Sequence, residues 1–293
     1  MQPGLEQQQS CPPKADGGAP TPELRKAGYT EKQGAGKGRD FCGGCAAPLQ
    51  HTHCLFLRDF LYNLKMRDFC YKCYKPRESC VCEVLKPFDP GIKFVFLMHP
   101  KEAKRQRTGT GRIAHAGLLD SEIIMGIDFT ENRRLCELLN DPKYFPVLLY
   151  PDENAWNSKK AGFKEAVNGR KILAIIIDST WFCSKKMIKL SKNIMALPKV
   201  SFSGDYRSIF TFKREPYPEC VSTIETCYYL TKELEDSGII EKNAPENLES
   251  LMDAFKAMIK FQLQKENDRI AGLLPNTHAN DYKFTKKKEI PDF

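Results

Sequence analysis

Three apolar runs in the middle of the chain, at 94–98, 147–150 and 172–177, give the strongest secondary-structure signal. Each run is flanked by proline, glycine or aspartate and is followed by a segment that suits a helix. Strands that are buried on both faces read as continuous apolar runs rather than as alternations. The pattern predicts an α/β domain with a mostly parallel sheet flanked by helices, to which 200–202 and 209–212 would add further strands.

Two helices are predicted towards the C-terminal end, at 222–237 and 246–269. The first stops at Gly238 and opens on Ser222-Thr-Ile-Glu225, the pattern of a capping box. The second repeats apolar residues at helical spacing. The capping box is a sufficient structural explanation of the Ser222 motif, although a helix N-terminus also attracts a ligand carboxylate.

Composition divides the chain into four parts. Residues 1–40 are rich in glycine and proline and nearly empty of large apolar residues, which predicts a disordered tail. We expect a small cysteine-rich zinc module at 41–90, the α/β domain at 91–270 and a basic C-terminal tail at 271–293. The longest apolar run is far too short for a membrane span, and no secretion signal opens the sequence. We therefore expect a cytoplasmic protein without membrane attachment.

Twelve cysteines are many for a chain of 293 residues, and seven of them fall within 41–86. Cys70-Tyr-Lys-Cys73 and Cys80-Val-Cys82 form a C-x2-C-x6-C-x-C motif. Four thiolates can surround one tetrahedral zinc ion when each pair sits on a tight turn. Without a secretion signal, clustered cysteines favour a metal over disulfides. We therefore predict a structural zinc site at Cys70, Cys73, Cys80 and Cys82.

A second cysteine pair precedes this motif. Cys42-Gly-Gly-Cys45 makes a similar turn, with His51, His53 and Cys54 nearby, and could hold a second metal. Its spacing matches no established ligand pattern, so two alternatives to a second metal stay open. The residues would be loop cysteines, or they would be alternative ligands for the first site.

The third apolar run ends on Asp178-Ser179-Thr180-Trp181. In open α/β sheets, ligands bind beyond the carboxyl ends of the strands. Asp178 could accept a proton there, and Trp181 could stack on a ring. Composition is equally consistent with a structural role, in which Asp178 caps the following helix and Trp181 packs in the core.

Basic residues gather in two places, and the chain carries a formal net charge of +8. The segment 101–112, after the first apolar run, reads as a glycine-containing basic loop. The helix after Trp181 carries Lys185, Lys189 and Lys192 on one side. Both segments suit contact with phosphates, and both also suit an ordinary solvated surface.

Six motifs, taken in order, resemble the DTW-domain family over about residues 68–263. They are Cys70-x2-Cys73-x2-Pro76-x3-Cys80-x-Cys82, His99-Pro-x-Glu102, Thr110-Gly-Arg112, Leu149-Tyr150-Pro151, Asp178-x-Thr180-Trp181 and Ser222-Thr223-x-Glu225. The resemblance implies a SPOUT-like α/β fold with a deep cofactor cleft, and it leaves a C-terminal knot open. Lys213 departs from the pattern, because relatives usually carry arginine there, and lysine cannot bind an anion bidentately.

The resemblance also implies an activity. The family comprises enzymes that use S-adenosylmethionine to place a 3-amino-3-carboxypropyl group on N3 of a tRNA uridine, releasing methylthioadenosine. Asp178, as the base, and Trp181, stacked on adenine or uracil, would then be the catalytic residues. The implied cofactor-binding residues are Tyr150, Pro151, Asp178, Ser179, Thr180, Trp181, Ser222, Thr223 and Glu225. The implied RNA contacts are His99, Lys101, Lys104, Arg105, Arg107, Arg112, Lys185, Lys189 and Lys213.

Three other functions remain open at this stage: aminocarboxypropyl transfer to ribosomal RNA, methyl transfer, and RNA binding without catalysis through a zinc knuckle. The released nucleoside separates the two chemistries, since methyl transfer leaves S-adenosylhomocysteine. A non-catalytic protein would bind RNA but not the cofactor.

Overall fold

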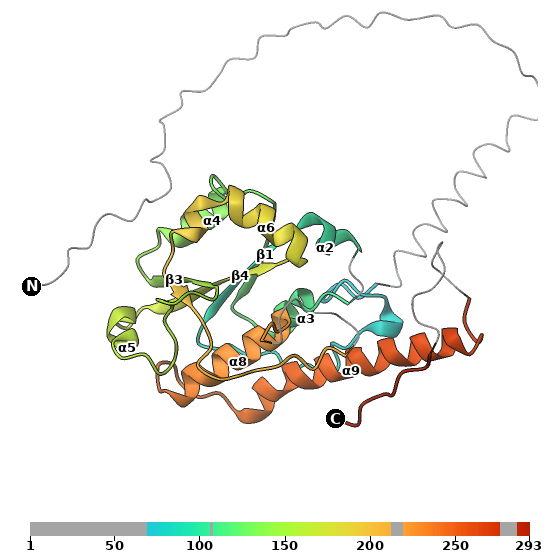
Figure 1. Ribbon diagram of the computed structural model, residues 1–293. Coiled ribbons are helices and arrows are strands. Elements are labelled where there is room, and N and C mark those ends of the chain that lie inside the picture. Colours follow the sequence, from blue (N-terminus) through green and yellow to red (C-terminus); the bar gives the residue numbers. More distant parts are fainter. Residues whose placement is uncertain (1–68, 106–107, 212–218, 276–285) are drawn as a thin grey trace, which may run out of the picture. The chain divides into compact units, whose positions relative to one another are not determined.

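The computed structural model describes residues 69–105, 108–211, 219–275 and 286–293, which form a parallel sheet with helices on both faces (Figure 1). The elements are η1 (Arg77–Ser79, a 3₁₀ helix), β1 (Lys93–Met98), α2 (Pro100–Arg105), α3 (Gly111–Gly117), β2 (Ser121–Met125), α4 (Arg133–Leu139), β3 (Tyr144–Leu149), α5 (Phe163–Val167), β4 (Lys171–Asp178), α6 (Trp181–Leu190), α7 (Lys192–Met195), β5 (Lys199–Val200), α8 (Thr223–Asp236) and α9 (Pro245–Ile270). The predicted tail at 1–40 and the second cysteine cluster lie outside the described residues.

The five strands all run parallel, in the order β2-β1-β4-β3-β5. The three apolar runs coincide with β1, β3 and β4, and all six residues of β1 are buried. The predicted α/β class and parallel sheet are therefore confirmed, whereas a knot stays a prediction.

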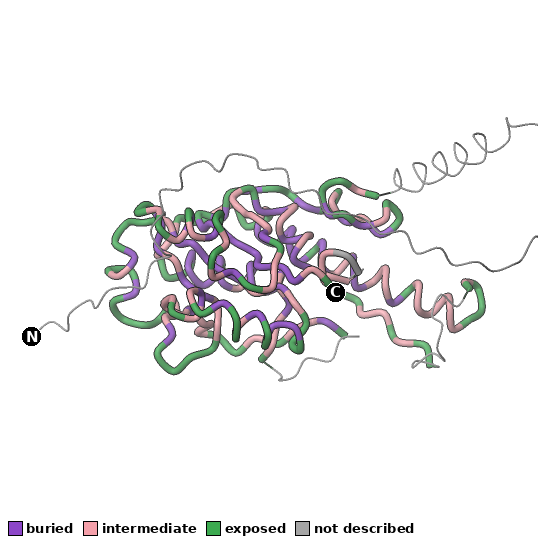
Figure 2. Tube along the Cα trace, turned by 90° about the horizontal axis from the view of Figure 1, so that it is seen from above, coloured by how far each residue is buried: buried purple, intermediate pink, exposed green. Residues whose placement is uncertain are grey.

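The two faces of the sheet carry separate cores. Phe94 and Phe96 of β1 pack in a core with α3, α8 and α9, while Val95 and Leu97 pack in a second core with α4, α6 and α7. This alternation follows from the pleat, which points successive side chains to opposite faces. Figure 2 shows the buried residues concentrated in the interior of the described domain.

The winding of the chain reverses between β1 and β4. The connection from β1 to β2 packs α3 on one face, and the connection from β4 to β5 packs α6 and α7 on the other, towards the opposite edge of the sheet. Open α/β sheets bind ligands at such a switch point, beyond the carboxyl ends of the strands. The two strands end together here, because Met98 pairs with Asp178 and the His99 N–H donates to the Asp178 carbonyl at 3.1 Å.

Two sequence-based predictions about local structure are wrong, and one strand has no counterpart in the sequence analysis. The described residues at 209–211 form no strand, because the Ile209 N–H donates to Glu225 and the Phe210 N–H to Ser208, both through side chains. The segment 101–112 is not simply a loop, since α2 and the first turn of α3 occupy much of it. The edge strand β2 was not predicted at all.

The two C-terminal helices confirm their sequence predictions, and α8 and α9 pack together on one face of the sheet (Figure 1). The chain end at 286–293 returns to α9, where the Asn267 side chain bonds both backbone groups of Lys288 at 2.8 and 2.9 Å. Among the described residues, none of the helices combines the length and apolar character that a membrane crossing requires.

Candidate active site and metal centre

Four cysteine side chains converge on one point, as their spacing predicts. All four Sγ atoms lie within 4.8 Å of one another, with Cys70–Cys82 and Cys73–Cys80 separations of 3.8 Å each. Zinc bonded to sulfur at about 2.3 Å in a tetrahedron holds its sulfurs about 3.8 Å apart. A disulfide would need about 2.05 Å. The donor set and its spacing therefore fit a zinc ion.

The backbone of the first pair explains how the thiols converge. The Tyr74 N–H donates to the Cys70 carbonyl at 2.8 Å, and Tyr74 turns the chain with a left-handed φ of 56°. Burial raises the pKa of Cys73 to about 11; for Cys70, burial is opposed by N–H groups of Cys73 and Lys72, which lower its pKa to about 6. Four crowded thiols cannot all ionise without a compensating cation, which is what a bound metal supplies.

The segment 70–82 carries the four cysteines and is called the cysteine turn below. It packs against the sheet domain. Val81, between Cys80 and Cys82, and Leu85, just after the motif, belong to the same core as Phe94 and Phe96. The Arg112 guanidinium, in the first turn of α3, lies 4.7 Å from the centre of the Tyr74 ring, within cation–π range. The turn therefore stands at the carboxyl edge of the sheet, beside the switch point.

A pocket opens where the cysteine turn meets the ends of β1 and β4. Its lining includes Cys73 and Gly109. Four of its lining residues carry ionisable groups with opposing charges. Two are cationic and two are acidic: Lys75, Arg112, Glu102 and Asp178. This polar lining distinguishes the pocket from the two apolar cores.

Asp178 is held in this pocket by neighbours from two helices. It is 8% exposed, and the Thr223 hydroxyl at the start of α8 donates to its Oδ1 at 2.8 Å. On the other side, a Cβ on Gly111 would stand 2.3 Å from Oδ2, so only glycine fits beside this carboxylate. Thr180, and not Asp178, is the N-cap of α6. The alternative of a helix-capping role for Asp178 therefore does not hold.

The start of α8 explains how Thr223 reaches Asp178. The Glu225 carboxylate is fully buried and accepts hydrogen bonds from the Ser222 N–H at 2.7 Å, the Ser208 hydroxyl at 2.7 Å and the Ile209 N–H at 2.8 Å. The bond from the Ser222 N–H is the glutamate half of the predicted capping box, and the other two bonds fasten the preceding loop to the helix. Glu225 thus acts on the site by fixing the helix start.

The other residues expected around Asp178 lie at the same edge of the sheet. Trp181 is 49% exposed and is therefore not a core residue. Tyr150 and Pro151 follow the end of β3, the strand next to β4, and both reach solvent. Ser179 and Thr180 link β4 to α6.

The expected RNA contacts divide by exposure. His99 is only 5% exposed, and its Nδ1 accepts the Lys101 N–H at 3.1 Å. Burial lowers the pKa of His99, and the nearby charges of Lys101 and Lys186 lower it further. Lys101, Lys185 and Lys189 are exposed.

The remaining expected RNA contacts lie on α2, on α3 and outside the described residues. Arg112 is half-buried against the Tyr74 ring. Lys104 and Arg105 belong to α2. Arg107 and Lys213 lie outside the described residues.

Sequence reasoning missed part of the pocket. Lys75 is only 4% exposed, and neither it nor Gly111 was singled out as a site residue. The family motifs contain a signal for these residues. Lys75 lies inside the cysteine motif, Glu102 is the last residue of His99-Pro-x-Glu102, and Gly111 is the middle residue of Thr110-Gly-Arg112.

Comparison with known proteins agrees with this architecture. Residues 67–263, more than half of the chain, match the model of the DTW domain. The protein therefore belongs to the DTW-domain family, and this membership supports a tRNA-modifying enzyme. No solved structure matches the chain.

Proposed function

We propose that this protein transfers the 3-amino-3-carboxypropyl group of S-adenosylmethionine to N3 of a uridine in tRNA. The polar pocket at the switch point, with the Asp178 carboxylate in its lining, is the observation that carries the proposal. Membership of the DTW-domain family supports the tRNA substrate.

The pocket suits one arm of S-adenosylmethionine. The methionine end of that molecule carries an ammonium and a carboxylate, which match the acidic Glu102 and the cationic Lys75 and Arg112. The amino-acid arm would occupy this pocket, leaving the ring system outside it.

The rest of the cofactor would lie along the carboxyl edge of the sheet. Tyr150, Pro151, Ser179 and Thr180 follow the ends of β3 and β4, the strands that flank this part of the edge. The half-exposed Trp181 indole offers a ring face for adenine or uracil. Ser222, Thr223 and Glu225 would shape the site from the start of α8, with Thr223 directing the Asp178 carboxylate.

The chemistry divides between the ligand and the protein. When bound, S-adenosylmethionine supplies an activated carbon next to its sulfonium. The protein has to orient the reacting groups, which lowers the barrier by removing their freedom beforehand. It also has to take the proton from uridine N3, and Asp178 would accept that proton as a general base.

The zinc site would be structural in this scheme. The four cysteine thiolates would fill all four positions of a tetrahedral zinc ion and would leave none open for a substrate. Its ligand Cys73 and its neighbours Tyr74 and Lys75 line the pocket, so the metal would hold one wall of the site.

Replacing Asp178 by asparagine tests the proposal. Asp178→Asn keeps the Thr223 hydrogen bond and the close fit against Gly111, so the variant should fold and bind S-adenosylmethionine normally. It should lose transfer by roughly 100-fold or more, the usual contribution of a general base. Thermal unfolding, calorimetric binding and nucleoside mass analysis measure the three properties. Full transfer by the variant would remove Asp178 from the role of base, and loss of binding would make it a cofactor ligand instead.

A further inference from the structure

An aromatic side chain that no motif includes stands at the start of α6. Phe182 is 84% exposed, which makes it the most exposed of the large apolar side chains in the described part of the chain. Exposing a phenylalanine ring to this extent forfeits most of the free energy that its burial would provide. Its neighbour Cys183 is buried, so the helix itself is properly seated on the sheet.

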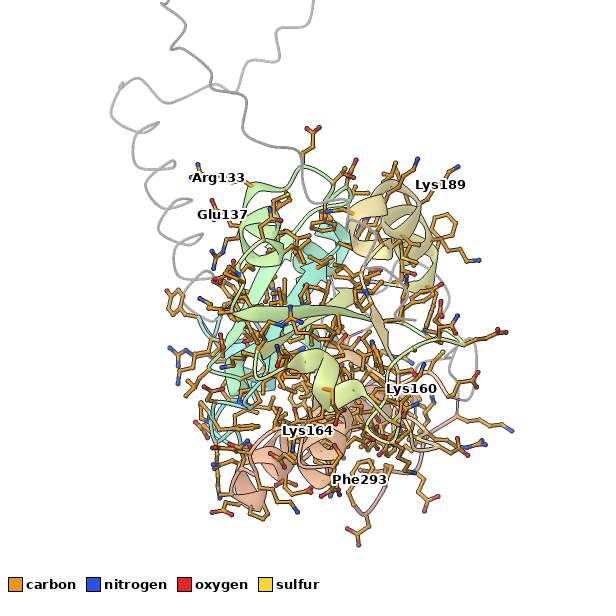
Figure 3. All side chains as sticks on the ribbon, turned by 90° about the vertical axis from the view of Figure 1, so that its left-hand side faces the viewer. Arg133, Glu137, Lys160, Lys164, Lys189 and Phe293 are labelled. Atoms are coloured by element: carbon orange, nitrogen blue, oxygen red, sulfur yellow. The ribbon has the colours of Figure 1, made fainter. Side chains whose placement is uncertain are left out.

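Phe182 continues a row of basic residues. Phe182, Lys185, Lys186 and Lys189 are spaced i, i+3, i+4 and i+7, which places them on one face of a helix. All four are exposed, and α6 contains no acidic residue. Figure 3 shows Lys189 extending outward from α6, away from the sheet. We call these four residues the α6 stripe.

The α6 stripe borders the candidate active site. Phe182 follows Asp178 by four residues, so their Cα atoms are at most about 14 Å apart. Lys186 of the stripe and Lys101 of α2 both lower the pKa of His99, so both charges lie near the paired ends of β1 and β4. The stripe therefore continues the polar pocket outward over the surface.

The geometry points to the α6 stripe as a binding surface for single-stranded RNA, with Phe182 stacking on a base next to the modified uridine. Exposed aromatic rings combined with lysines are how proteins hold unpaired strands, because every base has a face for stacking and every phosphate a negative charge. A duplex offers no unstacked base for the ring. The inference rests on the proposed function for its choice of RNA and adds a residue that the family motifs do not contain.

Binding of two RNA probes by two Phe182 variants tests this inference. The probes are a single-stranded oligouridine and a fully paired RNA duplex of equal charge. Phe182→Ala should weaken binding of the single strand by roughly 5- to 150-fold, the range for loss of one stacked base, and should leave duplex binding unchanged. Phe182→Tyr keeps the ring and should bind like the unaltered protein.

The matched control is Leu119→Ala, which removes another exposed apolar side chain (69% exposed). Leu119 lies at the amino end of the sheet, just before β2. It should change neither binding constant. Equal binding of the single strand by Phe182→Ala and the unaltered protein would overturn the inference, as would equal weakening of both probes. In the first case the ring would serve a different partner, such as a protein surface.

This experiment separates the inference from the proposed function, because it measures RNA binding without S-adenosylmethionine or turnover. Ring-dependent binding in a protein that transfers no aminocarboxypropyl group would uphold the α6 stripe and reject the enzymatic proposal. Aminocarboxypropyl transfer by a protein whose RNA binding does not depend on the Phe182 ring would uphold the enzymatic proposal and reject the α6 stripe.

Discussion

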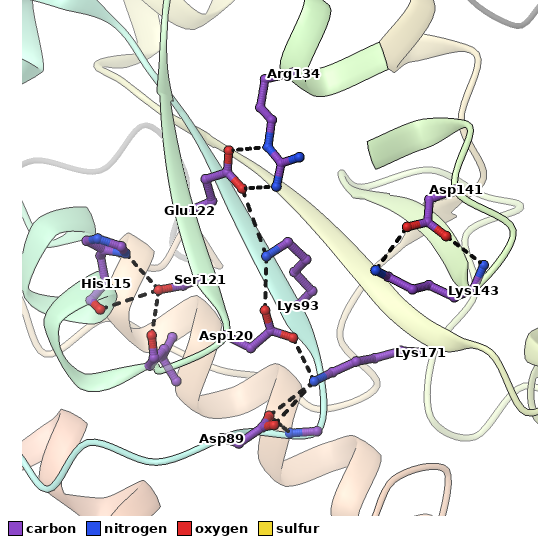
Figure 4. Close-up of polar contacts among 12 residues, drawn as sticks. Asp89, Lys93, His115, Asp120, Ser121, Glu122, Arg134, Asp141, Lys143 and Lys171 are labelled. Carbon is purple, nitrogen blue, oxygen red and sulfur yellow. Dashed lines mark hydrogen bonds and ion pairs between the residues drawn. The ribbon is translucent and has the colours of Figure 1, made fainter. Parts of the chain in front are cut away.

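The two ends of the parallel sheet handle charge in opposite ways. At the amino end, Lys93 and Lys171 both bond Asp120, at 2.9 and 2.6 Å, and Glu122 forms a two-bonded pair with Arg134 at 2.8 and 2.9 Å (Figure 4). At the carboxyl end, the lysines of the α6 stripe enter no ion pair within the described part of the chain.

The difference teaches which charges hold the fold and which are left for a ligand. A charge that is already neutralised by a neighbour gains little from a new partner, whereas exposed unpaired cations attract an anionic strand at long range. The pocket beside these lysines has charged groups of both signs in its lining. We therefore expect substitutions at the amino end to change stability, and substitutions at the carboxyl end to change binding and transfer.

Loss of the metal should have the largest effect. Cys73→Ser removes a thiolate that also lines the pocket, so we expect loss of bound zinc, a decrease of several kcal/mol in the free energy of unfolding, and loss of transfer. Metal analysis of the purified protein and thermal unfolding measure the change. Cys183→Ala removes a buried thiol outside the cluster and should keep the zinc content of the unaltered protein. The zinc assignment would be contradicted if the unaltered protein purified without metal and were as stable as the same protein supplied with zinc.

A methyl group placed beside Asp178 should have the next largest effect. Gly111→Ala would force the Asp178 carboxylate to move, and a displacement of about 1 Å in a site can cost roughly 100-fold in rate. Turnover at saturating substrate measures this loss of rate.

The control for that change is Gly117→Ala at the other end of α3. Its added methyl would stand 2.7 Å from a Leu251 side-chain carbon, in the core and away from Asp178. Both variants should lose stability by roughly 1–3 kcal/mol through overpacking. Similar turnover in the two would show that the contact between Gly111 and Asp178 has no catalytic consequence.

Asp120→Asn sharpens the comparison from the amino end. Burial opposes ionisation of Asp120, but hydrogen bonds from Lys171 and Lys93 outweigh it and hold its pKa below the usual range. Since the folded-state pKa is the lower one, this carboxylate stabilises the fold above the ordinary aspartate pKa, and the contribution disappears as pH falls through the folded-state value.

The free energy of unfolding of the variant should therefore be lower by roughly 1–3 kcal/mol at pH 7 and by less at acid pH. Its transfer activity should be unchanged. Denaturant unfolding at several pH values checks this. Asp141→Asn, which removes an exposed pair with Lys143, should matter far less. An Asp120→Asn protein that is fully stable but inactive would break the proposed division between the two ends.

The smallest effect is expected for one lysine of the α6 stripe. Lys189→Gln should weaken RNA binding and reduce the slope of log affinity against log salt by about 1, the signature of one phosphate contact. Stability should change by no more than roughly 0.5 kcal/mol. Lys164→Gln, an exposed lysine on α5, is the matched control (Figure 3). Equal salt slopes for the two variants would count against the α6 stripe.

The sequence predicts the inner strands well and the edges poorly, for a physical reason. β1 and β4 are buried on both faces and read as apolar runs. β2, at the sheet edge, has one buried residue in five and includes Glu122, which the ion-pair network uses. At 209–211 an apolar segment packs its Phe210 ring in the core but bonds its backbone to side chains, so apolar residues alone do not identify a strand there.

The candidate site was predictable only in part. Asp178 stands at the end of an apolar run and the cysteines share a ligand spacing, so local sequence indicates both. Lys75 and Gly111 join Asp178 only when the cysteine turn packs on α3 and β4, which no local pattern reveals. The exposure of Phe182 depends in the same way on which face of α6 meets the sheet.

Incubation of the unaltered protein with bulk tRNA and S-adenosylmethionine, followed by mass analysis of the nucleosides, tests the central claim most directly. A carboxyl-end site that presents the amino-acid arm predicts uridine enlarged by a 3-amino-3-carboxypropyl group, together with an equal amount of methylthioadenosine. Methylated nucleosides with S-adenosylhomocysteine, or unchanged tRNA in the presence of folded, zinc-loaded protein, would contradict it.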